Sequence, residues 1–178
     1  MNILIFAYGS MMALEQMRSR CPNARRLVRA RLPENTLCFP RYSVARKGAV
    51  AGVRPQKASS VWGVLWELTA DDLVVLDRHE GFVPGRATEA NAYNRRTVNV
   101  LADGYADRVI GADIYDAVPQ PNPGPPSIGY LEHLFAGAAE ARLPPEYIHG
   151  LQGLVPLKNT SDFQARQDTC KLLVWSGL

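Results

Sequence analysis

Glu80 is the acidic residue whose position in the sequence best suits chemistry, because it lies at the end of a predicted helix. On a helical period of about 3.6 residues it shares a face with Leu73 and Leu76, so its carboxylate is expected to point inward. Partial burial raises the pKa of a carboxyl group toward the range in which it acts as a general base at neutral pH. The alternative is that residues 78–81 form a solvated helix end without a function.

A turn near the N-terminus is the second candidate site, and it is made of Tyr8, Gly9, Ser10, Met11 and Met12. The turn lies between an apolar segment and a predicted helix, and such a turn presents several backbone N–H groups outward. These groups can hold a carboxylate or stabilise a developing oxyanion. The alternative is that the turn only caps the helix that follows.

Other known catalytic and ligand-binding patterns are missing. Ser10 lacks the G-x-S-x-G context of a serine hydrolase. His79 and Glu80 are not continued to H-E-x-x-H, and His133 and His149 have no ligand-like spacing. The glycine-rich phosphate-binding loops G-x-x-x-x-G-K-[ST] and G-x-G-x-x-G do not occur either. We therefore expect no metal ion and none of the usual nucleotide-binding loops.

Short segments with turn residues between them are expected to position these groups. Residues 2–7 are typical of a strand that is buried on both faces. Ser10 is expected to cap a helix over residues 11–20, which Pro22 ends. Three irregular strand-like segments follow, punctuated by prolines: residues 26–32, 36–42 and 49–53, with Pro33, Pro40 and Pro55. A clearer strand over residues 61–68 is predicted to have one core-facing side, formed by Trp62, Val64, Trp66 and Leu68.

The second half of the chain alternates strands and helices. Thr69 and Asp72 have the spacing of a capping box, so a helix is expected to begin there and to end at Gly81. Residues 93–101 and 109–118 are predicted to pair as a hairpin. A proline-rich loop then precedes a helix capped by Ser127, whose apolar residues have helical spacing: Leu131, Leu134, Phe135 and Ala138. A shorter helix is expected to start at Pro144 and Pro145. These elements predict an α+β protein built on a curled mixed sheet or small barrel.

Composition limits the class of protein. The chain has 178 residues, of which 47% are hydrophobic and 21% charged, so we expect one domain over residues 1–178. A net charge of +3 is too small to favour nucleic acid as a partner. Three cysteines without a C-x-x-C pair fit a reducing cytoplasm, and we expect neither an export signal nor a membrane span.

Several sequence blocks occur in a defined order: Phe6-Ala7-Tyr8-Gly9-Ser10, Val61-Trp62-Gly63-Val64-Leu65-Trp66, Leu76-Asp77-Arg78-His79-Glu80-Gly81, Tyr93-Asn94-Arg95-Arg96-Thr97-Val98-Asn99-Val100, Ile114-Tyr115 and Pro126-Ser127-Ile128-Gly129-Tyr130. The ordered set resembles the γ-glutamylcyclotransferase family, including its γ-glutamylamine cyclotransferase-like members. It spans residues 6–151, and the residues after it lie outside the resemblance.

This resemblance implies a small mixed β-barrel with flanking helices, a pocket at the barrel mouth and no cofactor. Glu80 matches the catalytic glutamate of the family, and Tyr8, Gly9 and Ser10 match its substrate-binding turn.

Four further positions complete the implied site. Tyr115 and Tyr130 match aromatic residues that line the pocket. Met11 and Met12 stand where the family often has asparagine and leucine, so from Met11 a backbone contact is expected rather than a side-chain one.

The implied activity is release of 5-oxoproline from a small γ-glutamyl compound. The α-amine attacks the γ-carbonyl of the same molecule, and Glu80 acts as general acid and base. Two alternatives stay open: a non-enzymatic member that binds small carboxylates, and an accessory domain of an amide-processing enzyme. The sequence leaves open whether an amino acid, a peptide such as the remainder of glutathione, an amine or a protecting group is released. It also leaves the oligomeric state open.

Overall fold

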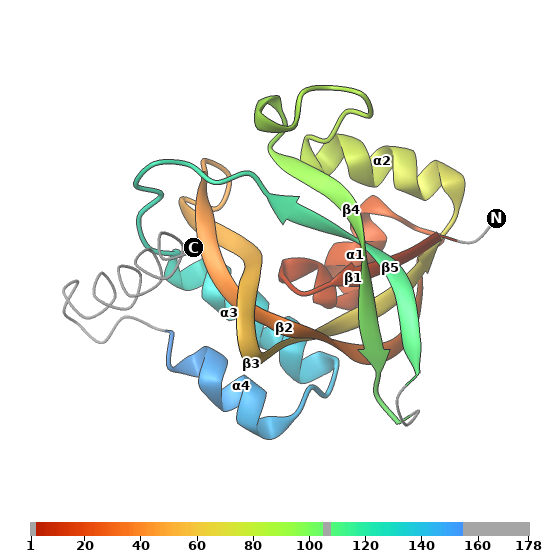
Figure 1. The fold of residues 1–178 in the computed structure, drawn as a ribbon, viewed down its shortest axis with the longest axis vertical. Coiled ribbons are helices and arrows are strands. Elements are labelled where there is room, and N and C mark those ends of the chain that lie inside the picture. Colours follow the sequence, from red (N-terminus) through yellow and green to blue (C-terminus); the bar gives the residue numbers. More distant parts are fainter. Residues whose placement is uncertain (1–2, 105–107, 155–178) are drawn as a thin grey trace.

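Five strands form a closed barrel in the structure, a computed structural model that describes residues 3–104 and 108–154 (Figure 1). The strands follow the order β1-β3-β2-β4-β5 around the barrel. Their bounds are β1 Ile3–Ala7, β2 Arg25–Ser43, β3 Gly48–Leu68, β4 Tyr93–Ala102 and β5 Val109–Ala117.

The barrel contains both parallel and antiparallel pairs. β1 runs antiparallel to β3 and parallel to β5, with Ile5 opposite Asp113 in the parallel pair. The predicted hairpin is present, because β4 and β5 pair antiparallel from Tyr93 opposite Ala117 to Leu101 opposite Val109. The expected fold, a small mixed β-barrel, is therefore confirmed.

Strands β2 and β3 are much longer than the sequence predicted. The prediction of separate short strands was wrong, because β2 and β3 pair along most of their lengths. Their register shifts between Pro33 and Asn35 and again between Cys38 and Arg41, so two of the prolines expected to separate strands lie at irregularities within one strand. An irregularity of this kind accommodates a residue without a backbone N–H and bends the strand, while pairing continues on both sides.

The predicted core-facing side of residues 61–68 is buried at Val64, Trp66 and Leu68, but the opposite side of the strand is buried as well. Leu65 and Trp66 are neighbours whose side chains point to opposite faces of β3, and both are fully buried. The guanidinium carbon of Arg26 lies 5.2 Å from the ring centre of Trp66 and helps to cover it. Both faces of this strand segment are therefore packed, which a pattern of alternate residues does not predict. In β1, Ile5, Phe6 and Ala7 are all buried, as expected for a strand that is covered on both faces.

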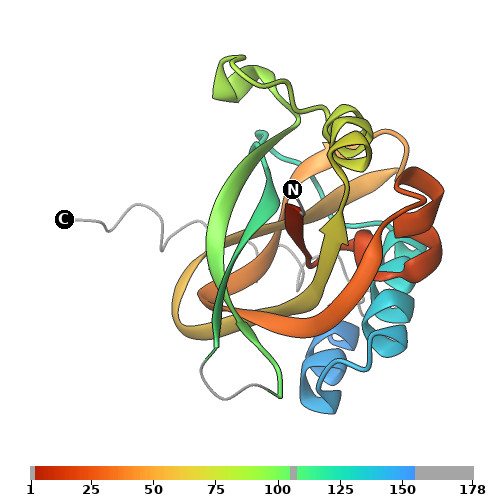
Figure 2. The same cartoon turned by 90° about the vertical axis from the view of Figure 1, so that its right-hand side faces the viewer.

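Within the described ranges, four α-helices flank the barrel: α1 Leu14–Arg20, α2 Ala70–Glu80, α3 Ile128–Glu140 and α4 Pro145–Gln152. Helices α3 and α4 lie together along one flank, whereas α2 lies away from them in both views (Figures 1 and 2). The predicted start of α4 at Pro145 is confirmed.

The ends of α2 and α3 follow the local sequence signals. The Thr69 hydroxyl accepts the N–H of Asp72, and Gly81 ends α2 with a left-handed φ of 66°. Ser127 caps α3 by accepting the N–H of Tyr130. These caps set where α2 and α3, two of the helices that carry pocket residues, begin, and Gly81 sets where α2 ends.

Candidate active site

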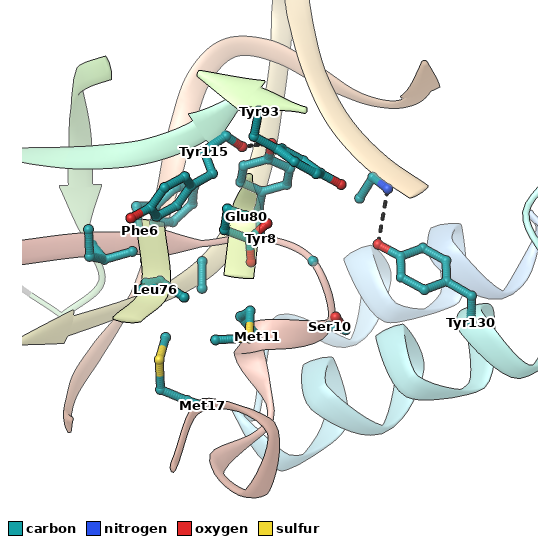
Figure 3. Close-up of a pocket in the computed structure, with 14 residues that line it drawn as sticks. Phe6, Tyr8, Ser10, Met11, Met17, Leu76, Glu80, Tyr93, Tyr115 and Tyr130 are labelled. Atoms are coloured by element: carbon teal, nitrogen blue, oxygen red, sulfur yellow. Dashed lines mark hydrogen bonds between the residues drawn. The ribbon is translucent and has the colours of Figure 1, made fainter. Parts of the chain in front are cut away.

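A pocket of about 70 Å³ lies where β1 ends, and it has room for several water molecules. Strands, helices and the turn after β1 all contribute to its wall (Figure 3). Its lining residues are Ile5, Phe6, Ala7, Tyr8, Gly9, Ser10, Met11, Met17, Ala51, Leu76, Glu80, Tyr93, Tyr115 and Tyr130.

Glu80 reaches this pocket from the last turn of α2, as its helical phase with Leu76 predicted. Its side chain is only 14% exposed, and its Oε1 accepts a hydrogen bond from Nη1 of Arg20 on α1 at 2.9 Å. Burial raises the pKa of the Glu80 carboxyl group above its usual value, while the positive charges of Arg20 and Arg46 partly oppose that rise. A buried carboxyl group with a raised pKa is suited to accept and return a proton near neutral pH.

The turn after β1 differs from the expected helix cap. Ser10–Met12 is a single 3₁₀ turn, and α1 begins only at Leu14, so the prediction that Ser10 caps a helix over residues 11–20 was wrong. The N–H of Met12 closes the turn by donating to the carbonyl of Gly9 at 3.0 Å. Among the described residues, the N–H groups of Ser10 and Met11 donate to no protein acceptor. The turn thus retains two donors beside the pocket.

The five turn residues divide into two groups. Tyr8, Gly9, Ser10 and Met11 line the pocket. The side chain of Met12 is fully buried in the core, and Met12 does not belong to the pocket wall. Met12 therefore packs the turn against the protein interior.

Tyr115 and Tyr8 form a buried hydrogen-bonded chain at one side of the pocket. The Tyr8 hydroxyl donates to the backbone carbonyl of Tyr115 at 2.6 Å, and the Tyr115 hydroxyl donates to Oδ1 of Asp77 at 2.6 Å. Arg95 lies 3.5 Å from the same Asp77 oxygen. Burial raises the pKa of both tyrosines, which keeps their hydroxyls protonated and able to donate. Tyr115 thus lines the pocket while its hydroxyl joins β5 to α2, three residues before Glu80.

Tyr130 enters the pocket from α3, as expected. Its hydroxyl accepts the backbone N–H of Ala51 at 3.0 Å, which attaches α3 to β3 (Figure 3). Burial raises its pKa to about 12. A Cβ atom at Gly9 would lie 3.4 Å from this hydroxyl, so the turn and Tyr130 approach each other closely.

Sequence reasoning missed several residues of this site. Tyr93 opens β4 and lines the pocket, and burial raises its pKa. Its hydroxyl makes no hydrogen bond to the described part of the chain, so it stays available to a ligand. Tyr93 begins one of the sequence blocks that resemble the γ-glutamylcyclotransferase family, and this was the signal that could have identified it as a site residue. Arg20 and Met17 gave no signal of this kind, because α1 comes near α2 only in the folded barrel.

Two features are absent from the described residues. No group of three or more histidine, cysteine, aspartate or glutamate side chains in residues 3–104 and 108–154 is arranged to hold a metal ion. No helix in those ranges is both long and apolar enough to cross a membrane.

Several known proteins are similar to this chain in both sequence and architecture. The sequence profile of the AIG2-like family matches residues 60–151. The γ-glutamylcyclotransferases of human and cattle are 28% and 29% identical over 161 residues, which covers 87% of this chain and 80% of each relative. A solved γ-glutamyl cyclotransferase superimposes with a TM-score of 0.78 at 28% identity, over 90% of this chain and 92% of its own.

The fold extends to more distant structures. A yeast γ-glutamyl cyclotransferase, described as specific to glutathione, has a TM-score of 0.59 at 16% identity and covers 86% of this chain and 95% of its own. The matched profile covers about half of the chain and contains Glu80, Tyr93, Tyr115 and Tyr130. The chain therefore belongs to the AIG2-like family and has the γ-glutamylcyclotransferase fold that its sequence blocks predicted.

Proposed function

We propose that this enzyme is a cyclotransferase that releases 5-oxoproline from a small γ-glutamyl substrate, with Glu80 as general acid and base. The observation that carries this proposal is the position of Glu80, a largely buried carboxylate in a pocket whose wall also includes a turn with two unpaired N–H donors. The names of the human and bovine relatives support the same reaction class.

The reaction needs no nucleophile from the protein. The α-amine of a bound γ-glutamyl group forms the new C–N bond to its own γ-carbonyl carbon, and the old bond from that carbon to the leaving nitrogen breaks. Holding the substrate folded removes much of the entropic barrier, on the order of 7–11 kcal/mol in well-oriented cases. What the protein must supply is shape, proton transfer and stabilisation of charge.

Glu80 supplies the proton transfer in this proposal. The α-amine enters mostly as an ammonium ion, which cannot attack, so the carboxylate first removes a proton. The same carboxyl group then gives this proton to the leaving nitrogen. The second proton that the attacking nitrogen loses as the lactam forms passes to the released amine, which departs as an ammonium ion. The raised pKa of Glu80 suits this cycle, because it brings the carboxyl group closer to the pKa of the amine.

The turn after β1 supplies charge stabilisation. The γ-carbonyl oxygen becomes negative when the amine attacks, and backbone N–H groups that already face a pocket stabilise such an oxygen without reorganisation. The Ser10 and Met11 amides are the donors we assign to it. This role uses the backbone, so methionine at position 11 does not prevent it.

The tyrosines orient the substrate. Tyr93 and Tyr130 line the pocket beside Glu80, and a protonated phenol donates to carboxylate or carbonyl oxygens. The Tyr115 hydroxyl is already bonded to Asp77, so its role in substrate binding is limited to its ring.

The test compares Glu80→Gln with wild type on a panel of γ-glutamyl amino acids, γ-glutamylamines and glutathione, following 5-oxoproline by mass spectrometry. We expect the variant to remain folded and to lose about 10²–10⁴-fold in kcat, the usual contribution of a positioned acid and base. Glu67→Gln is the matched control, because Glu67 also pairs with an arginine, Arg25 at 2.6 Å, but does not line the pocket.

Two outcomes would count against the proposal. Near wild-type turnover by Glu80→Gln would remove Glu80 from the mechanism. Binding of 5-oxoproline by the folded wild-type protein, without turnover of any substrate in the panel, would instead support the alternative of a carboxylate-binding member of the fold.

A further inference from the structure

Arg46 places a positive charge at the edge of the pocket. It lies in the connection between β2 and β3, and its guanidinium carbon is 5.9 Å from the ring centre of Tyr130. Its Nη2 is 3.5 Å from the Ser10 hydroxyl oxygen and 2.8 Å from Oε1 of Gln16. Two of these neighbours, Tyr130 and Ser10, are pocket-lining residues. Its charge also lowers the pKa values of Glu80 and Tyr130, against the stronger effect of burial.

Arg46 has no acidic partner among the described residues, in contrast to three other arginines. Arg20 pairs with Glu80, Arg25 with Glu67 and Arg95 with Asp77. In the part of the chain that the structure describes, the guanidinium of Arg46 contacts only neutral oxygens and an aromatic ring, although Arg46 is half-buried. A partly desolvated guanidinium that makes no ion pair with the described residues is a favourable place for a carboxylate, which it can bind through two parallel hydrogen bonds.

The Ser127 hydroxyl group connects the backbone at Arg46 with the backbone at Tyr130. Ser127 donates to the backbone carbonyl of Arg46 at 2.6 Å and accepts the N–H of Tyr130 at 3.2 Å. The chain beside it is held as well, because the N–H of Ala49 donates to the carbonyl of Pro125 at 3.0 Å. At Gly48, a Cβ atom would lie 2.4 Å from the Ser127 nitrogen, so only glycine permits this close approach. The backbone that carries the Arg46 side chain is therefore held in place by contacts with the segment that leads into α3.

We propose that Arg46 binds a carboxylate of the substrate and so determines which γ-glutamyl compounds the pocket accepts. This inference rests on the proposed function. A γ-glutamyl amino acid carries two carboxylates, one on the glutamyl α-carbon and one on the leaving amino acid, whereas a simple γ-glutamylamine carries only the first. The shared chemistry is a carboxylate beside a guanidinium, and the two sources are separated by experiment.

The experiment compares wild type, Arg46→Gln and Lys47→Gln on two ligand pairs. The first pair is γ-glutamylalanine and γ-glutamylethylamide, which differ by the leaving-group carboxylate, with KM measured for both. The second pair is 5-oxoproline and pyrrolidin-2-one, which differ by the α-carboxylate, with dissociation constants from NMR titration. Lys47→Gln removes the same charge from the neighbouring, exposed position.

We expect Arg46→Gln to lower the affinity for carboxylate-bearing ligands by about tenfold or more, because a charge-assisted contact is lost. If KM rises for γ-glutamylalanine but not for γ-glutamylethylamide, Arg46 binds the leaving group. If both KM values rise and 5-oxoproline weakens while pyrrolidin-2-one does not, it binds the α-carboxylate. Either result supports the inference.

The inference is overturned if Arg46→Gln changes the two members of each pair by the same factor, which is the signature of a structural role or of none. It is also overturned if Lys47→Gln has the same effect as Arg46→Gln. Failure of the proposed function gives a different result, because wild type would then form no 5-oxoproline from any substrate. The dissociation constants of 5-oxoproline and pyrrolidin-2-one from NMR would still show whether Arg46 binds a carboxylate.

Discussion

The carboxyl group of Glu80 is subject to two opposing effects, and their balance sets the pH at which it can act. Burial favours the neutral acid, and the Arg20 guanidinium at 2.9 Å favours the ionised form. The net direction is a raised pKa, so burial is the stronger effect. A general base must be ionised before it can accept a proton, so Arg20 extends the activity of the proposed enzyme toward lower pH.

Replacing Arg20 by methionine should therefore move the acidic limb of the pH profile of kcat. Without the guanidinium the pKa of Glu80 rises further, so activity falls first at the acidic end, and the limb moves to higher pH by about one unit or more. Steady-state rates across the pH range measure this. Arg25→Met, which removes the partner of Glu67 outside the pocket, should leave the profile in place. An unmoved profile for Arg20→Met would show that the ion pair is only structural.

At the scale of elements, α2 determines where Glu80 lies, and its ends are held in different ways. Its start is fixed by the Thr69 cap, and its end by the left-handed turn at Gly81. Between them, the Asp77 carboxylate accepts the Tyr115 hydroxyl from β5. Helix, turn and strand together leave the Glu80 side chain little freedom to move away from the pocket.

Gly81→Ala tests the turn that ends α2. Alanine is strained at a φ of 66°, and its Cβ atom would lie 2.9 Å from the Cβ atom of Ala92. We expect a loss of stability of about 1–3 kcal/mol in urea denaturation. Gly150→Ala is the control, because Gly150 lies in α4 with no atom within 4 Å of an added Cβ, and there the better helix former should be neutral or stabilising. Equal stabilities for the two variants would contradict the role assigned to Gly81.

Tyr115→Phe tests the connection between β5 and α2. The variant keeps the ring in the pocket wall but removes a hydrogen bond to a buried carboxylate, which costs about 1.5–3 kcal/mol. We also expect a lower kcat, because the helix that carries Glu80 loses this anchor, and both quantities are measured on the same sample. Tyr42→Phe, at an exposed tyrosine, should change neither. A loss of stability with an unchanged kcat would show that the anchor does not position Glu80.

At the scale of the whole molecule, local signals predicted some parts of the fold and not others. The capping residues of α2 and α3 and the β4–β5 hairpin are encoded within a few residues of each other, and they were found. The continuity of β2 through Pro33 and Pro40 depends on pairing with β3 across the barrel, which no local pattern reports. The parallel pair of β1 and β5 joins residues more than a hundred positions apart and is equally invisible to periodicity.

The same division applies to the site. Glu80 could be predicted to face inward, because its phase relative to Leu76 is a property of one helix. Its partner Arg20 could not, because the two residues are 60 positions apart and meet only through the packing of α1 against α2. Tyr115 was placed correctly at the pocket, but the direction of its hydroxyl, toward Asp77, depends on where α2 lies relative to β5.

The connection between β2 and β3 can change in sequence or length without a change in the barrel. The ladder of the two strands ends at Ser43 opposite Gly48, so the residues between them, Arg46 included, carry no barrel hydrogen bonds of their own. Glu80 and the Tyr8–Met11 turn belong to other parts of the chain. Substitution or lengthening of this connection can therefore change which substrates the proposed enzyme accepts, while Glu80 and the turn after β1 stay unchanged.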